Sequence, residues 1–271
     1  MRHACVAVVA LFVLSAVASD RALAAETQAS QYIAPSVKVD GSLGWQWSDN
    51  VNQSGTTRTS DNFVSSFLKV TLQGKTSDGT GYYLYARAFN EFYDRTSSDN
   101  TLGTVGATLA RSFEQFDAGI NLDGKKYYDR FFGSELRTAF DLSVYATRVF
   151  RFDNGLSAVV PRFTVGNRWA DASSAERTWI DAQLALEAHV AEQRWYVVSI
   201  SRLQVHWYHT AATGAVPQDF VPAQSLGVKY RFNDDISLTV SATVTGRSSN
   251  VGARNFSQWS LGPMLEFSHK F

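Results

Sequence analysis

The chain has 271 residues, and its 25 basic and 25 acidic side chains leave no formal net charge. This balance gives no general reason to expect a nucleic-acid partner, because nucleic-acid-binding proteins carry an excess of positive charge to meet phosphates. The mean hydropathy of −0.17 excludes a bundle of membrane-spanning helices but not a membrane barrel, in which only alternate residues face lipid. The 18 Phe, 11 Tyr and 7 Trp favour strands over helices.

The N-terminus has the pattern of a secretory signal peptide. After a short basic start, residues 4–18 form an apolar or small-residue run, which is shorter than the ~20 residues that a spanning helix needs. An Ala-x-Ala cleavage pattern ends at Ala24, so we expect residues 1–24 to be removed. Cleavage after Ala18 and an uncleaved N-terminal helix are the alternatives. Cys5 lies too early in the run to become a lipidated N-terminus, so we expect a mature protein without cysteine or disulfides.

Residues 25–271 are expected to form one domain of long strands. Apolar and polar residues alternate over residues 37–48 and again over 236–245. These runs are about twice the 5–6 residues of an ordinary strand and suit the ~9–11 residues of a tilted membrane strand. We predict twelve strands, at 36–48, 62–75, 80–94, 106–122, 126–133, 136–152, 156–169, 176–190, 194–209, 224–233, 236–247 and 256–271. Ten or fourteen strands remain possible, because residues 104–114 alternate poorly and could be a loop helix, and 126–133 is short.

The predicted connections alternate between short and long. Tight turns are expected at Asp78-Gly79, Asp123-Gly124, Asn154-Gly155, Glu192-Gln193 and Asn233-Asp234, mostly from their turn-forming residues. Mostly longer, polar connections are expected at 49–61, 95–105, 170–175, 210–223 and 248–255. Short turns at one end and long loops at the other are typical of an outer-membrane β-barrel.

Charged residues fall almost entirely on one face of each predicted strand. A charge on the lipid face costs about 2–4 kcal/mol at mid-bilayer, so a membrane barrel needs this segregation. Glu114 and Arg148 are the exceptions, which a β-bulge could re-aim. The predicted polar face carries fourteen basic residues, Lys38, Lys69, Lys75, Arg87, Arg137, Arg162, Arg168, Arg177, Arg194, Arg202, Lys229, Arg231, Arg247 and Lys270, and seven acidic ones, Asp40, Glu91, Asp117, Asp141, Asp181, Glu187 and Glu266.

Aromatic residues of the other face gather at the two ends of the predicted strands. They therefore predict two rings at the membrane interfaces, as outer-membrane barrels have, whereas a soluble core would scatter them in depth. The ring at the loop end contains Trp45, Trp47, Trp169, Trp207 and Trp259, and the ring at the turn end includes Trp195, Phe267 and Phe271.

The last strand resembles the C-terminal signature of bacterial outer-membrane proteins, with apolar residues at alternate positions before a terminal aromatic: Trp259, Leu261, Pro263, Leu265, Phe267, His269 and Phe271. His269 departs from the apolar preference of that signature. The resemblance implies recognition by the barrel-assembly machinery. The stretch Ser48-Asp49-Asn50, followed by a polar loop and Ser60-Asp61, loosely resembles β-barrel porin families.

A barrel of about twelve strands lies between small filled barrels and wide pores, so its function depends on what fills the interior. The polar face has an excess of seven positive charges, which water would make tolerable and which would favour anions. We therefore predict a porin-like diffusion channel for small, preferably anionic solutes, and known twelve-stranded channels for acidic sugars resemble this chain in architecture. The expected lining is Lys38, Lys69, Arg87, Glu91, Arg137, Arg162, Arg168, Arg177, Arg202, Lys229, Arg231 and Arg247.

Two other functions remain open. Ion pairs could close the interior of a structural or adhesive barrel, and the loop at 210–223 is the segment most suited to fold inward. A lipid-modifying enzyme would need a Ser–His pair at the lipid-facing outer rim, and no histidine of the predicted strands has that position. We expect no enzyme activity, cofactor or metal site.

Overall fold

The computed structural model describes residues 33–271 except 97, 130, 193 and 212–213. The predicted signal peptide, residues 1–24, lies outside the described residues. Among those described, no helix is long and apolar enough to cross a membrane. The strands are β1 (Ile33–Ser48), β2 (Asp61–Lys75), β3 (Thr80–Tyr93), β4 (Asn100–Ser112), β5 (Asp117–Tyr128), β6 (Glu135–Thr147), β7 (Phe150–Phe152), β8 (Ser157–Ala170), β9 (Arg177–Ala191), β10 (Trp195–Tyr208), β11 (Gln218–Arg231), β12 (Ile236–Ser249) and β13 (Phe256–Lys270).

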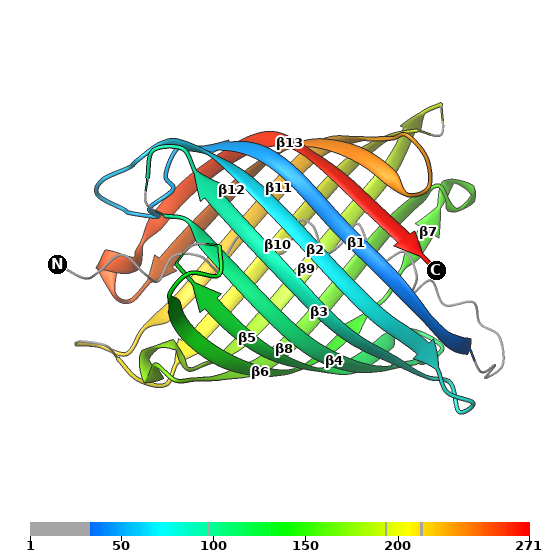
Figure 1. Ribbon diagram of the computed structural model, residues 1–271, viewed down its shortest axis with the longest axis horizontal. Helices are drawn as coiled ribbons and strands as arrows, with labels where there is room; N and C mark the ends of the chain where they lie inside the picture. The colour runs from blue at the N-terminus through cyan, green and yellow to red at the C-terminus, as the bar shows by residue number, and fades with distance from the viewer. Residues whose placement is uncertain (1–32, 97, 130, 193, 212–213) are drawn as a thin grey trace.

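The strands form a single antiparallel sheet that closes on itself (Figure 1). Apart from β6 and β7, strands that follow one another in the chain pair along the sheet, and β1 pairs with β13 and β6 with β8. The short β7 pairs with the start of β8, beyond the end of β6. The ring therefore contains twelve strands, which confirms the prediction of an all-β, antiparallel up-and-down barrel of about twelve strands.

The closing seam between β1 and β13 is closely packed. The ring of Phe267 lies where a side chain at Gly41 would stand, and the backbone of Trp45 lies where a side chain at Gly262 would stand. The register runs from Lys38 opposite Lys270 to Ser48 opposite Ser260, with a gap opposite Gly262 and Pro263. Proline has no N–H to donate to the ladder, so the two strands meet here without the regular bonds.

The prediction was wrong in detail between residues 104 and 133. The predicted turn at Asp123-Gly124 lies inside β5, where Asp123 pairs with Gly106 and Gly124 with Val105. The real turn is at residues 113–116, closed by a bond from the N–H of Phe113 to the carbonyl oxygen of Phe116 (2.8 Å). The two strands predicted at 106–122 and 126–133 correspond to β4 and β5, which lie at Asn100–Ser112 and Asp117–Tyr128. The turn between them was misplaced, but the number of strands was still correct.

Two other strand boundaries differ from the prediction. β11 begins at Gln218, so residues 218–223 are strand and not part of a loop that folds inward. Pro222 is accommodated because the β11–β12 ladder skips its position, where proline removes a hydrogen bond. The strand predicted at 136–152 ends at Thr147, and Arg148 lies in the break before β7. Glu114 lies in the turn at 113–116, so neither charge exception belongs to a strand.

The two ends of the barrel carry different connections. At one end, here the turn end, short turns join the strands, and Gly79 and Gly155 adopt φ angles of 85° that favour glycine. At the other end, the loop end, the segments 49–60, 94–99, 129–134, 171–176, 209–217 and 250–255 join them. The pairing of Lys38 with Lys270 places the start of β1 and the end of β13 at the turn end (Figure 1).

Candidate functional site in the barrel interior

The barrel encloses a cavity of about 410 Å³. Its lining runs along the strands from Gly155 and Leu156 at the turn end to Arg168 and Arg177 near the loop end. A second cavity of about 250 Å³ lies at the turn end beside the seam and shares Lys229 and Glu266 with the first. Small-molecule sites commonly have volumes of about 300–1,000 Å³, so the main cavity has room for a solute of monosaccharide size.

The alternation of the strands separates the two sides of the wall. On β2, for example, Val64, Leu68 and Val70 are exposed, whereas Ser65 and Thr71 are buried. Eight basic and six acidic side chains line the main cavity, an excess of two positive charges. The interior therefore holds the charged residues that a lipid-facing wall could not carry at low cost.

The predicted lining residues divide into three groups. Arg87, Arg162, Arg168, Arg177, Arg202 and Lys229 line the main cavity, and Lys38 and Arg231 line the second one. The remaining four pack against the wall. Lys69 lies 4.8 Å from the ring centre of Tyr85, Arg137 lies 4.2 Å from that of Tyr127, Glu91 accepts a bond from Asn100 (2.7 Å), and Arg247 pairs with Asp219 (3.6 Å).

Most of the acidic side chains are paired with bases on nearby strands. Asp141 receives two bonds of 2.6 Å from the guanidinium of Arg168 and a third of 2.6 Å from Lys125. Asp181 pairs with Arg202, and Glu187 pairs with both Arg231 and Lys229. The partners occupy neighbouring strands or strands two apart, so these pairs follow the wall rather than cross the interior.

Several charged residues of the interior were missed by the sequence prediction, among them Arg151, which lines the main cavity. Asp123 and Lys125 fell at a predicted turn, yet Asp123 is buried and both contribute to the cavity lining. Asp219 fell in a predicted loop, yet it is 1% exposed and pairs with Arg254 (2.6 Å) as well as Arg247. A period-two pattern does continue through residues 117–128, and following it past Asp123-Gly124 would have found Asp123 and Lys125.

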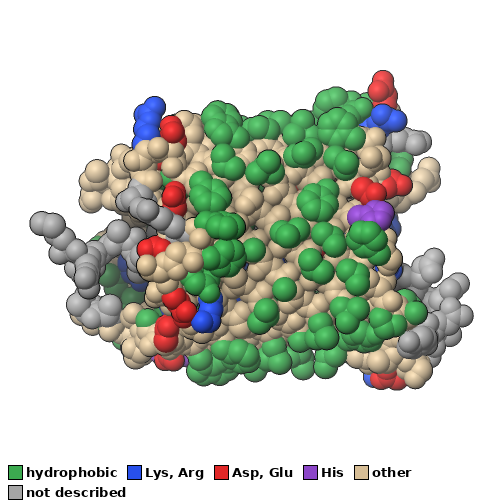
Figure 2. Space-filling model, viewed as in Figure 1, with side chains coloured by type: hydrophobic (Ala, Val, Ile, Leu, Met, Phe, Trp, Pro, Cys, Tyr) green, Lys and Arg blue, Asp and Glu red, His purple; other side chains and the backbone are tan. Residues whose placement is uncertain are grey.

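The outside of the barrel is apolar in its middle. Figure 2 shows hydrophobic side chains across the visible wall and charged side chains at its two ends. Leu43, Val105 and Ile120, from three different strands, are each more than half exposed. The predicted interface aromatics also lie on this surface near the strand ends: Trp45, Trp47, Trp169, Trp207 and Trp259 are 37–55% exposed toward the loop end, and Trp195, Phe267 and Phe271 are 42–74% exposed at the turn end.

No family model and no curated protein matches the chain. Among solved structures, an outer membrane channel from Pseudomonas putida F1 is similar over 89% of this chain and 100% of that chain, with 13% identity and a TM-score of 0.55. A likeness at this identity shows the fold, and the fold is a closed barrel with an apolar exterior. The chain is a bacterial outer-membrane β-barrel.

Two more distant similarities add nothing to this assignment. The KdgM porin is 7% identical, with 83% of this chain and 99% of that chain covered and a TM-score of 0.45. The β domain of the Bordetella autotransporter BrkA is 15% identical, with 87% and 100% covered and a TM-score of 0.43.

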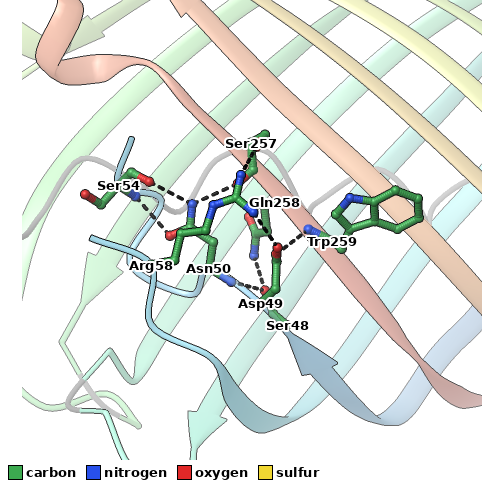
Figure 3. Close-up of polar contacts among 8 residues, drawn as sticks. All are labelled: Ser48, Asp49, Asn50, Ser54, Arg58, Ser257, Gln258 and Trp259. Atoms are coloured by element: carbon green, nitrogen blue, oxygen red, sulfur yellow. Dashed lines mark hydrogen bonds and ion pairs between the residues drawn. The ribbon is translucent and has the colours of Figure 1, made fainter. Parts of the chain in front are cut away.

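In this outer-membrane barrel, polar contacts fix the first long loop over the seam (Figure 3). The amide of Asn50 donates to the carbonyl oxygens of Ser54 (2.9 Å) and Ser257 (2.8 Å), and its oxygen accepts from the N–H of Ser54 (3.1 Å). Arg58 pairs with Asp49 (3.1 Å), which also accepts from the N–H of Trp259 (2.6 Å). The loop is thus held against β13.

Two observations concern the alternatives of a metal site and a hydrolase. The described residues contain no group of three or more His, Cys, Asp or Glu side chains that could hold a metal ion. At the loop end, the hydroxyl of Thr178 contacts His209 (3.1 Å) and Asn167 (2.9 Å). A hydroxyl has one proton to donate, and Asn167 competes with His209 for it. Nucleophilic catalysis needs that proton on the histidine.

Proposed function

We propose that this outer-membrane barrel is a diffusion channel for small solutes and that it favours anionic ones. The observation that carries the proposal is the cavity of about 410 Å³, whose charged lining extends from the turn end to near the loop end. A barrel with a purely structural role could fill the same space with side chains and leave no cavity, as small barrels do.

The chemistry of the lining favours a wet interior. A charge buried without water or a partner costs several kcal/mol, and the arginines of this wall outnumber the carboxylates that reach them. Arg87 lines the cavity, and its Nε atom has no hydrogen-bond partner among the described residues. Water in the cavity would satisfy such groups at low cost.

The sign of the excess favours anions. Basic residues exceed acidic ones by two in the main cavity, and rings of Arg and Lys select anions in channels. The excess is smaller than the polar-face count of seven, because eight of the fourteen predicted bases and two of the seven predicted acids lie outside this lining, which gains Lys125, Arg151 and Asp123. We therefore expect a preference for anions rather than strict selection.

The second candidate is a closed structural barrel. Its supporting observation is the series of ion pairs that joins neighbouring strands, such as Arg168–Asp141 and Arg202–Asp181. Such pairs could stiffen the wall without any transport.

The two candidates differ in solute flux. Proteoliposomes loaded with protein are supplied with glucose or glucuronate, which have similar sizes and differ by one carboxylate, and valinomycin lets K⁺ carry the compensating charge. A channel of the proposed kind admits both, with glucuronate the faster. A folded barrel that admits neither solute supports the closed barrel, and faster entry of glucose contradicts the anion preference.

A further inference from the structure

Arg177, the first residue of β9, has an unusual environment inside the barrel. It is 6% exposed and lines the end of the main cavity that is nearer the loops. Its Nη1 atom donates to the hydroxyl of Tyr208 (3.0 Å), while no carboxylate lies within ion-pair distance among the described residues. A buried charge without a countercharge is destabilising, so this position requires an explanation.

A second arginine lies directly opposite. Arg168 on β8 and Arg177 on β9 are register partners, and Arg168 is 3% exposed. Like charges at directly opposed positions destabilise a sheet. Arg168 is bound on one side by Asp141, but that carboxylate also serves Lys125. The shared acid cannot neutralise Arg177 as well.

Several buried nitrogen atoms around this end of the cavity have no hydrogen-bond partner among the described residues. The Nη1 atoms of Arg168 and Arg202, the Nε atom of Arg177 and the Nδ1 atom of His206 are buried without a hydrogen-bond partner among the described residues. His206 is 4% exposed, and its electrostatic neighbours include Arg177, Arg168 and Arg202. Buried polar groups are nearly always satisfied in proteins, and the three guanidinium nitrogens can only donate, so their concentration here marks a site for an acceptor, to which His206 can also donate in one of its tautomers.

The charges of this region do not cancel. The region contains six basic side chains, Lys125, Arg168, Arg177, Arg202, Arg247 and Arg254, and four acidic ones, Asp123, Asp141, Asp181 and Asp219. Of these, Lys125, Arg168, Arg177, Arg202, Asp123, Asp141 and Asp181 belong to the lining of the main cavity, where the bases exceed the acids by one. This part of the lining is therefore positive.

We propose that Arg168, Arg177 and His206 form a binding site for an oxyanion, a carboxylate or phosphate group of a small solute. Guanidinium groups bind such groups through two parallel N–H bonds, and an oxyanion supplies both the missing negative charge and the missing acceptors. Trp179 lies opposite His206 and lines the same cavity, so its ring can pack against the body of the solute. The site rests on the proposed channel function, in which it would be the first anion-binding site that a solute meets below the loops.

Equilibrium binding tests the site without requiring transport. Isothermal titration calorimetry of the refolded barrel in a non-ionic detergent and low-chloride buffer uses acetate and inorganic phosphate as separate probes. Binding of either is expected, and the stronger probe identifies the preferred oxyanion. We expect Arg177→Gln to weaken that binding at least about tenfold, because hydrogen bonds to charged groups are lost. Arg177→Lys keeps the charge but not the planar guanidinium group, so its affinity should lie between those of the wild type and Arg177→Gln.

Arg231→Gln is the matched control. It removes the same charge from the same interior, but Arg231 is paired with Glu187 near the turn end, so the affinity should change less than about twofold. Absence of binding by the folded wild-type barrel, or equal losses in Arg177→Gln and Arg231→Gln, would overturn the site. If Arg177→Gln does not fold, the comparison of Arg177→Lys with wild type decides. Oxyanion binding without solute flux would contradict the proposed channel but support the site. Solute flux without oxyanion binding would contradict the site but support the channel.

Discussion

The hydrogen bonds of Asn50 allow a worked prediction for the closing seam. Asn50 is fully buried, and its side-chain amide makes three hydrogen bonds, two to Ser54 and one to Ser257 on β13. In Asn50→Ala all three are lost, and the carbonyl oxygens and N–H that they served lose a partner in a partly buried site. At a net value of roughly 1 kcal/mol for each bond, the free energy of unfolding should fall by about 3 kcal/mol.

Asn52→Ala is the control for this prediction. Asn52 lies in the same loop, but it is exposed and bonds only within the loop, to Thr57 and Thr59. Its replacement should cost less than about 1 kcal/mol, since surface substitutions have small effects. Denaturant unfolding of both variants in lipid vesicles, followed by tryptophan fluorescence, measures the difference. Equal losses of stability in Asn50→Ala and Asn52→Ala would refute the view that the bond to Ser257 fastens the loop to β13.

Three further predictions concern the interior, the lipid face and the seam. Replacing Arg87, Arg162 and Arg202 together with glutamate changes the lining from an excess of two positive to four negative charges, so the reversal potential should lose or reverse its anion preference; an unchanged potential would contradict the electrostatic account. The side chain of Val105, in the middle of β4, is 65% exposed, so Val105→Arg should lower the free energy of unfolding in vesicles by about 2–4 kcal/mol. A change near zero would show that this position does not face lipid. Gly262→Ala forces a methyl group against the backbone of β1 and should slow barrel refolding, measured by the rate at which the heat-modifiable band appears on gels; normal refolding would show that the seam can widen freely.

The elements with unbroken alternation were predictable from sequence. Strands predicted at 36–48 and 236–247 correspond to Ile33–Ser48 and Ile236–Ser249, because each side chain on these strands either faces lipid or the interior, and the period of two is visible directly. The same alternation identified Arg168, Arg177 and Arg202 as residues of the polar face, and the structure places them on the cavity.

The region around β4 and β5 was not predictable in the same way. Asp123-Gly124 has the composition of a tight turn, but pairing with Val105 and Gly106 holds it in a strand, and Asp123 accepts a bond from Tyr85. The real turn lies between Phe113 and Phe116, whose rings stack at 5.1 Å, and it contains no Gly, Pro, Asn or Asp. Tertiary pairing overrode local propensity at both places.

The sequence also could not predict which charged side chains pair with one another inside the barrel. Counting bases and acids on one face predicts an excess, but it does not show which groups meet. Asp141 binds both Arg168 and Lys125, whereas Arg177, directly across the ladder from Arg168, donates only to a tyrosine hydroxyl among the described residues. These differences depend on strand register, which alternation alone leaves undetermined.

The central claim is that the interior of this barrel conducts small ions and favours anions. Its most direct test is the reversal potential of the refolded wild-type protein in a planar lipid bilayer under a KCl gradient. We predict discrete conductance steps and a reversal potential displaced toward the chloride equilibrium potential, with the displacement growing as the salt concentration falls because screening weakens. A potential displaced toward potassium would contradict the anion preference, and the absence of conductance from a barrel shown to be folded would contradict the channel itself.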